Sequence, residues 1–151
     1  MKGELQDLID QFLKILHLYA VINRKPKDYG TGDLLYLTEI HTLTMVARNR
    51  RINMTRLAEM MGVTRGAISQ TIRKMVIKGL IVKENSTNRK EFNLSLSPKG
   101  EKVMKAQESL QKEIFSFAAT LYEKAGTKDR EMVARLFTAI SGNMEERVKA
   151  L

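Results

Sequence analysis

The chain has 151 residues, 43% of them hydrophobic, a net charge of +9 and no cysteine. This length suits one compact domain or two small subdomains that share a core. The lack of cysteine excludes disulfides, thiol chemistry and thiolate metal sites, and we expect a protein of the reducing cytoplasm. The most apolar run, residues 12–22, contains Lys14 and His17 and is too short and too polar to span a bilayer. The acidic start MKGELQDLIDQ does not resemble a signal peptide.

The positive charge is concentrated in the middle of the chain. Residues 48–90 hold eleven basic residues against two acidic ones, a net of +9, whereas residues 1–47 have a net of −1 and residues 91–151 a net of +1. This concentration indicates a polyanionic partner for the middle segment, with nucleic acid as the first hypothesis. The alternative is a basic surface that is merely solvated, which a charge spread evenly along the chain would favour.

The first third of the chain predicts a helix, a loop and a second helix. Residues 4–23 place apolar side chains at three- and four-residue spacing, which is typical of an amphipathic helix. Residues 24–32 hold one proline and two glycines and predict a loop, followed by a short turn at 33–36. Thr38 is the predicted N-cap of a helix that runs to about Arg48.

Two helices then meet at Gly62-Val63-Thr64, within the stretch TRLAEMMGVTRGAISQTIRK. Asn53 or Thr55 caps the first, and Gly62 ends it because glycine adopts a left-handed conformation without strain. Thr64 caps the second helix, and Val63 is expected to anchor the turn in the core. A tight turn of this kind allows a helix-turn-helix to hold its second helix exposed and at an angle to the first.

Strands and two long helices follow. Residues 80–82 are a β-prone apolar run, residues 84–90 are polar and rich in turn formers, and residues 92–97 alternate apolar and polar side chains. Two strands joined by a polar turn predict a β-hairpin, the wing. Ser97-Pro98 is an N-cap followed by proline at the first helical position, which begins a long helix to about residue 124. A last helix is predicted over residues 128–150.

The predicted fold class is mainly α (α+β): a winged helix-turn-helix domain with a two-stranded wing, flanked by N- and C-terminal dimerisation helices. We expect one continuous domain in which residues 33–97 form a DNA-binding lobe and residues 1–32 and 98–151 supply the dimerisation helices. The flanking helices carry more apolar surface than a winged domain needs, and a homodimer built from both chain ends explains it economically. The alternative is that these helices fold back on their own domain.

The second helix of the motif is the predicted recognition helix. We expect Ile68, Ile72, Met75 and Val76 to face inward. On the opposite face, Arg65 is expected to read guanine and Gln70 to read adenine. Serine and threonine are common phosphate partners, and Arg73 and Lys74 are assigned to the DNA backbone. The candidate residues of this helix are Thr64, Arg65, Gly66, Ser69, Gln70, Thr71, Arg73 and Lys74. For each of them alone, the alternative is a solvated helix face.

Two further groups of residues are candidates for DNA contact. The wing tip holds Asn88, Arg89 and Lys90, and a basic tip is suited to the minor groove, where the negative potential favours arginine. The segment that leads into the first helix of the motif supplies candidates for the DNA backbone: Arg51, Asn53, Thr55 and Arg56.

At these residues the sequence resembles the MarR (multiple antibiotic resistance regulator) family of bacterial and archaeal transcription regulators. The resemblance covers roughly residues 37–100 by motif, and the flanking helices match by length and pattern alone. The matching stretches are TEIHTL at 38–43, NMTRLAEMMG at 53–62, VTRGAISQ at 63–70, KGLI at 78–81 and LSPKG at 96–100.

The resemblance implies an obligate homodimer that binds a pseudo-palindromic operator, usually as a repressor. It also implies that a small anionic or aromatic ligand changes the spacing of the two recognition helices. Ligand pockets of the family lie between the dimer helices and the DNA-binding lobe, where the candidates are His17, Tyr19, Tyr36, His41 and Met45. The alternative is that the tyrosine and methionine side chains belong to the hydrophobic core and that the histidines make structural hydrogen bonds. The family wing often begins with aspartate, whereas this chain has Asn88, so an ionic brace of the wing is absent or weaker.

Other classes of function fit the sequence less well. It has no glycine-rich phosphate loop, no nucleophile elbow and no His/carboxylate set with catalytic spacing, so we expect no enzyme and no cofactor. Two histidines and no thiol argue against a metal site. A non-specific architectural DNA-binding protein remains the main alternative, and a module that uses the winged helix to bind another protein is a second.

Overall fold

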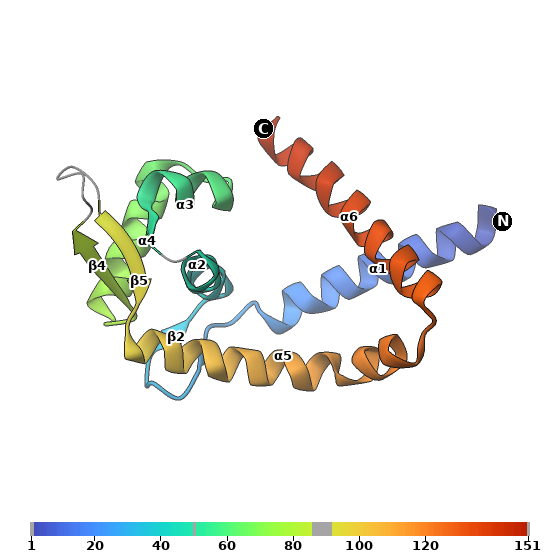
Figure 1. The fold of residues 1–151 in the computed structure, drawn as a ribbon, viewed down its shortest axis with the longest axis horizontal. Coiled ribbons are helices and arrows are strands. Elements are labelled where there is room, and N and C mark those ends of the chain that lie inside the picture. Colours follow the sequence, from blue (N-terminus) through green and yellow to red (C-terminus); the bar gives the residue numbers. More distant parts are fainter. Residues whose placement is uncertain (1, 50, 86–91, 151) are drawn as a thin grey trace.

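The computed structural model describes residues 2–49, 51–85 and 92–150, and its helices and strands confirm the predicted fold class. The elements, in chain order, are α1 (Lys2–Ile22), β1 (Lys27–Asp28), β2 (Leu34–Leu35), α2 (Leu37–Arg48), β3 (Ile52–Asn53), α3 (Met54–Met61), α4 (Arg65–Ile77), β4 (Ile81–Asn85), β5 (Phe92–Leu96), α5 (Pro98–Lys124) and α6 (Thr127–Lys149). Figure 1 shows α2, α3, α4 and the strands gathered into a lobe at one end of the molecule. Helices α1 and α6 and the far half of α5 form an arm at the other end.

The sheet of the lobe has one more strand than the sequence predicts. Its order is β3-β5-β4, all antiparallel, and β5 pairs with β3 through Ile52 opposite Leu94. The sequence predicts only β4 and β5, because β3 has two residues, too few to show the alternation that marks a strand. Residues 24–36, predicted as a loop and a turn, also contain the small antiparallel pair of β1 and β2.

One hydrophobic core fills the lobe and holds α4 in place. Of the predicted inward side chains of α4, Ile68, Ile72 and Met75 are buried, and Val76 is partly buried and packs against the core. The three buried side chains belong to the same cluster as Leu57 of α3 and Leu94 of β5. The core therefore joins the two helices of the motif to the base of the hairpin.

The prediction for Val63 is wrong. Its side chain is 43% exposed, and the turn is held by the backbone instead, where the Val63 N–H donates to the Ala58 oxygen at 3.1 Å. Gly62 ends α3 in the left-handed conformation, with φ of +62°, as expected. The turn therefore needs a glycine and a backbone hydrogen bond but no apolar anchor.

Most of the predicted helix caps are confirmed by their hydrogen bonds. The Asn53 side chain accepts from the Arg56 N–H at 2.8 Å, and the Ser97 hydroxyl oxygen accepts from the Gly100 N–H at 3.0 Å. The prediction of Thr38 as a cap is wrong, because α2 already begins at Leu37. There the Glu39 carboxylate accepts from the Tyr36 N–H at 2.9 Å. A carboxylate in the first helical turn stabilises the positive end of the helix.

Three lysines fasten the β1–β2 hairpin to the lobe. Lys78, at the end of α4, lies 2.7 Å from the Glu39 carboxylate and donates to the Leu34 oxygen at 3.0 Å. Lys99 pairs with Asp33 at 2.6 Å. Lys102 donates to the Gly30 oxygen at 2.7 Å. The link from α1 is thereby tied both to the recognition helix and to the start of α5.

The loop of this hairpin is organised by one carboxylate. Asp28 accepts backbone N–H bonds from Gly30, Thr31 and Gly32 at 2.9 to 3.1 Å. The bond from Thr31, then those from Gly32 and Gly30, and the positive charge of Lys102 together hold the pKa of Asp28 below its ordinary value.

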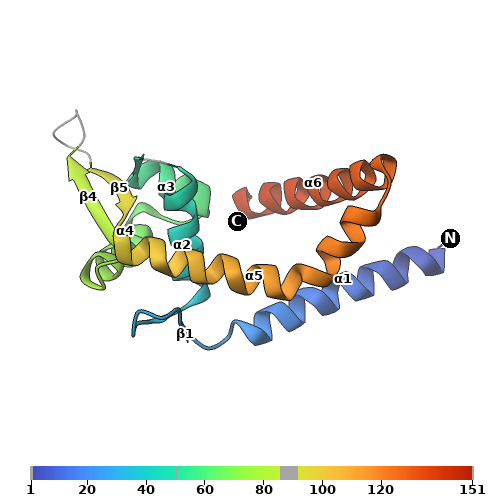
Figure 2. The same cartoon turned by 60° about the horizontal axis from the view of Figure 1, so that its bottom comes forward.

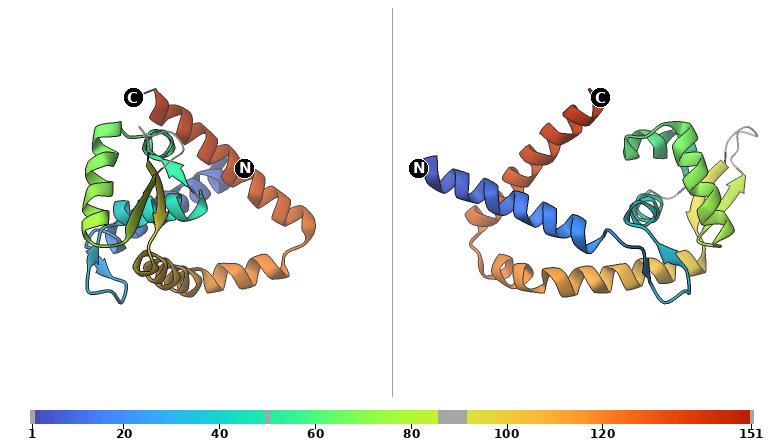
Figure 3. Two further views of the ribbon diagram at one scale, coloured as in Figure 1. Left: turned by 60° about the vertical axis from the view of Figure 1, so that its left-hand side comes forward. Right: turned by 180° about the vertical axis from the view of Figure 1, so that it is seen from behind.

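The arm leaves large apolar side chains in solvent. Helix α6 turns back from α5 after residue 124 and points its C-terminal end toward the lobe, as Figures 1 and 2 show. In the right view of Figure 3, which shows the molecule from behind, α1 passes in front of the start of α6. The most exposed of its apolar residues include Leu5, Ile15, Phe117, Leu121, Met132 and Phe137. The division of the chain into a lobe at 33–97 and dimerisation helices stays a prediction, although the β1–β2 hairpin crosses its boundary.

Replacement of Gly100 by alanine should destabilise the fold. A Cβ at Gly100, in the first turn of α5, would lie 2.2 Å from the Leu80 carbonyl oxygen, so the helix would have to move away. We expect a loss of about 1–3 kcal/mol in the free energy of unfolding, measured by urea denaturation at one fixed protein concentration.

Gly142→Ala is the matched control, because nothing lies within 4 Å of a Cβ at Gly142 in the middle of α6. This variant should gain up to about 1 kcal/mol from helix propensity. Equal effects of the two substitutions would show that the contact between Gly100 and Leu80 does not limit the packing.

Candidate nucleic-acid interface

Helix α4 presents a polar, basic face to solvent, opposite its buried stripe. Thr71 is half-buried, and its hydroxyl donates to the Ala67 carbonyl oxygen at 3.2 Å. The other predicted contacts on this helix are exposed: Thr64, Arg65, Gly66, Ser69, Gln70, Arg73 and Lys74. The structure therefore brings together, on one helix face, the residues that the sequence assigns to DNA contact.

The N-terminal end of α4 is a positive site in its own right. Thr64 caps it, with its hydroxyl oxygen accepting from the Ala67 N–H at 3.2 Å, as predicted. The aligned peptide dipoles of a helix place partial positive charge at this end, which favours an anion such as a phosphate. Arg65, the first helical residue, adds a full charge at the same place.

The predicted backbone contacts before and on α3 are only partly available. Thr55 is exposed, and Asn53 is half-buried as the N-cap of α3. Arg56 pairs with Glu59 at 3.2 Å, with both side chains largely exposed. Arg51 has a positive φ of +58°, uncommon for a residue with a side chain, and lies 3.9 Å from Glu84 of the hairpin. An exposed ion pair is weak, so either arginine can exchange its carboxylate partner for a phosphate.

The predicted wing contacts Asn88, Arg89 and Lys90 lie outside the described residues, but the base of the wing is described. There the Lys83 ammonium lies 5.9 Å from the centre of the Phe92 ring. The two side chains border one hollow together with Met54, Arg65, Gly66 and Ser69. Sequence reasoning missed both residues, since Lys83 is one basic residue among eleven and Phe92 fits the strand pattern of β5.

The five residues predicted for a ligand pocket do not form an obvious enclosure. His17 and His41 are exposed, Tyr36 is more than half exposed, and Met45 packs against the core of the lobe. Tyr19 lies near Tyr29, whose pKa is raised by burial and by the Tyr19 hydroxyl. The ligand site stays a prediction.

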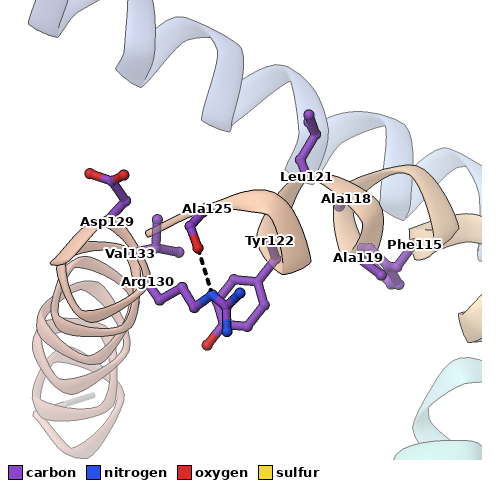
Figure 4. Close-up of a pocket in the computed structure, with 9 residues that line it drawn as sticks. All are labelled: Phe115, Ala118, Ala119, Leu121, Tyr122, Ala125, Asp129, Arg130 and Val133. Atoms are coloured by element: carbon purple, nitrogen blue, oxygen red, sulfur yellow. Dashed lines mark hydrogen bonds between the residues drawn. The ribbon is translucent and has the colours of Figure 1, made fainter. Parts of the chain in front are cut away.

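An apolar cavity of about 530 Å³ lies elsewhere, at the elbow between α5 and α6. Figure 4 shows its lining, which includes Phe115, Leu121 and Val133 but none of the predicted pocket residues. The Arg130 side chain spans the elbow, donates from Nε to the Ala125 oxygen at 3.0 Å and lies 5.4 Å from the Tyr122 ring. The arginine thereby ties the start of α6 to the end of α5.

The described part of the chain holds no candidate metal site and no candidate membrane span. No group of three or more histidine, aspartate or glutamate side chains there is placed to hold a metal ion. Nor is any helix of that part both long enough and apolar enough to cross a membrane.

Comparisons with known proteins agree with this geometry. Residues 35–92 match the family model described as the MarR family. A 77-residue stretch is 35% identical to the uncharacterized HTH-type transcriptional regulator YhjH of Bacillus subtilis (strain 168) and covers 50% of this chain and 44% of that protein. The matched part therefore spans less than half the length of this curated relative.

Solved structures match along almost the whole chain. They include FabT of Streptococcus pneumoniae in complex with DNA, with a TM-score of 0.69, 16% identity and coverage of 96% of this chain and 97% of that one. The adhesin competence repressor AdcR of Streptococcus pyogenes has a TM-score of 0.67 and 18% identity, with 93% and 98% covered. The zinc-responsive MarR family member ZitR of Lactococcus lactis has a TM-score of 0.63 and 20% identity, with 93% and 99% covered. Residues 35–92 therefore carry a domain of the MarR family, and nearly the whole chain has the fold of solved MarR proteins.

Proposed function

We propose that this chain is a homodimeric, sequence-specific double-stranded DNA-binding protein that regulates transcription in the cytoplasm, as a repressor. The observation that carries the proposal is the two-sided character of α4. Its apolar stripe is buried, while Arg65, Gln70 and Arg73 are exposed on the opposite face in the segment that holds the chain's excess positive charge. Arginine and glutamine on a helix that enters the major groove are the side chains suited to guanine and adenine.

The relatives support this proposal. FabT was solved in complex with DNA, and AdcR is named as a repressor. YhjH is described as a transcriptional regulator, in keeping with the lack of catalytic motifs in the sequence.

The dimer is supported by the apolar side chains of the arm. Phe117 of α5 is 76% exposed, and α1 and α6 also carry rows of exposed leucine, isoleucine, phenylalanine and methionine. Large contiguous apolar surface is uncommon on a monomer and is typical of an interface. A second copy is the natural occupant, because a two-fold axis also presents two α4 helices to two half-sites of an operator.

Regulation by a small anionic or aromatic ligand is part of the proposal. A ligand that binds more tightly to one spacing of the two α4 helices would shift the population of dimers competent to bind DNA. The candidate contacts remain His17 and Tyr19 on α1 of the arm, and Tyr36, His41 and Met45 at the start of or within α2 of the lobe.

Selection of bound duplexes from a random DNA pool at physiological salt tests the central proposal. We expect an inverted repeat whose half-sites are about one helical turn apart, bound at least about a thousandfold more tightly than random duplex. Recovery of unselected sequence would favour the alternative, a non-specific architectural DNA-binding protein.

Gln70→Ala should relax the preference for one base pair of the selected site. The expected cost is roughly 1–3 kcal/mol on the selected duplex, measured by titration against duplexes that carry each substitution at each position. Arg73→Ala is the control, since loss of a backbone contact should weaken every duplex alike. If Gln70→Ala also weakened all duplexes equally, Gln70 would not be a base-reading residue.

Phe117→Glu should dissociate the dimer. Burial of a phenylalanine contributes about 1.5–3 kcal/mol, and two-fold symmetry repeats the loss, so the dimer dissociation constant should rise more than about a hundredfold. Sedimentation equilibrium measures it. Ile77→Glu is the control, because Ile77 is equally exposed, at 77%, but lies at the end of α4 in the lobe. A monomeric wild-type chain would contradict the dimer, as would equal effects of the two substitutions.

A further inference from the structure

Lys83 is a charged residue on the core-facing side of a strand. In the pairing of β4 with β5, Ile81 lies opposite Leu96 and Lys83 opposite Leu94. Residues directly opposite each other in antiparallel strands project to the same face, and alternate residues of one strand share a face. Ile81 and Leu94 are buried, so Lys83 projects from the face of the hairpin that covers the core, toward the side where α4 lies.

The Lys83 residue is exposed, and its side chain lies by an aromatic ring. Its ammonium is 5.9 Å from the centre of the Phe92 ring. Phe92 is two residues from Leu94 on the same face of β5, and about half of it is exposed. An ammonium is attracted to the negative face of an aromatic ring, which favours a defined position for a long and otherwise flexible side chain.

The hollow beside this pair is shared with the recognition helix. It is lined by Lys83 and Phe92 of the hairpin, by Met54 of α3, and by Arg65, Gly66 and Ser69 of the first two turns of α4. Two cations, a hydroxyl and the positive end of a helix therefore face one concave surface. Gly66 has no side chain to fill it. This combination of groups is suited to a phosphate oxyanion.

We propose that this hollow binds one phosphate of the DNA backbone, at the point where the DNA strand passes from the groove contacted by α4 to the β4–β5 hairpin. Lys83 makes the charge contact, and Phe92 is a positioning residue that holds the ammonium toward the hollow. The inference rests on the proposed DNA-binding function and deepens it, because it fixes a point at which the backbone meets the protein.

A structural role for Lys83 is the rival explanation. Strand β4 lies at the edge of the sheet, and an inward-pointing charge on an edge strand discourages pairing with another chain. That role requires a charge of either sign. The edge-strand role accounts neither for the Phe92 ring beside the ammonium nor for the shared hollow. The two explanations therefore predict different results when the charge at position 83 is reversed.

The experiment compares the salt dependence of DNA binding between full-length variants, on the selected duplex and on a random duplex of equal length. In the dimer, Lys83→Gln removes two phosphate contacts. The slope of the logarithm of the binding constant against the logarithm of the salt concentration should therefore fall in magnitude by about 1.8. The wild type would then lose about tenfold more affinity than the variant between 50 and 200 mM salt. Lys83→Glu, which keeps a charge on the edge strand, should bind more weakly than Lys83→Gln and remain equally soluble.

Phe92 is tested by a pair of variants. Phe92→Leu keeps an apolar side chain but removes the ring, and should lower the slope by part of the amount seen for Lys83→Gln. Phe92→Tyr keeps the ring and should restore it. Lys105→Gln is the charge control, since this exposed lysine lies on α5, away from the hollow, and its loss should leave the slope unchanged.

The inference would be overturned if both Lys83 variants kept the wild-type slope while Arg73→Gln, which removes another backbone contact, reduced it. Lys83 would then have only the edge-strand role. A slope change equal to that of Lys105→Gln would overturn the inference as well. Lack of preference for the selected duplex over the random one would overturn sequence-specific regulation instead. The phosphate contact would still be tested in that case, because it does not depend on base sequence.

Discussion

The burial of one side of α4 is the constraint on which the rest of the structure depends. Ile68, Ile72 and Met75 are each at most 2% exposed, and each contributes about 1.5–3 kcal/mol relative to an exposed side chain. Together they are comparable with the net stability of a whole domain. No single substitution on the outer face can offset that sum. The residues of the outer face can therefore be chosen to suit the binding partner of α4, while the core fixes the angle of the helix.

The two ends of α4 are held by different means. At its start, Thr64 satisfies one backbone N–H and leaves the positive end of the helix open to an anion. At its end, Gly79 takes a left-handed φ of +70°, and the Lys78 side chain reaches the largely buried Glu39 carboxylate. The first end suits the proposed contact with DNA, and the second joins the helix to α2 and the β1–β2 hairpin. Replacing one member of such a partly buried ion pair lowers the stability of the fold, because the remaining charge loses its partner.

Sequence alone predicts the features that depend on neighbouring residues. The caps at Thr64 and Ser97, the left-handed Gly62 and the buried stripe of α4 all follow from local rules and are confirmed. Features that depend on residues far apart in the chain were missed: β3 exists only because β5 pairs with it. The pair of Lys83 and Phe92 likewise requires the register of the hairpin. Val63 shows a different error. Its apolar side chain predicts an anchor in the core, but backbone hydrogen bonds close the turn instead.

Helix α5 connects the arm to the lobe that holds α4. It has 27 residues, about 40 Å at 1.5 Å per residue. Its first turn touches Leu80 so closely at Gly100 that a Cβ would not fit, and Lys99 also donates to the Lys78 oxygen at the end of α4. A continuous helix transmits a change of tilt along its length. In the proposed dimer, a shift of the two arms against each other would therefore move both α4 helices, and the close packing at Gly100 leaves little slack to absorb it. In the proposed regulation, a ligand bound far from α4 would act on DNA affinity through this connection.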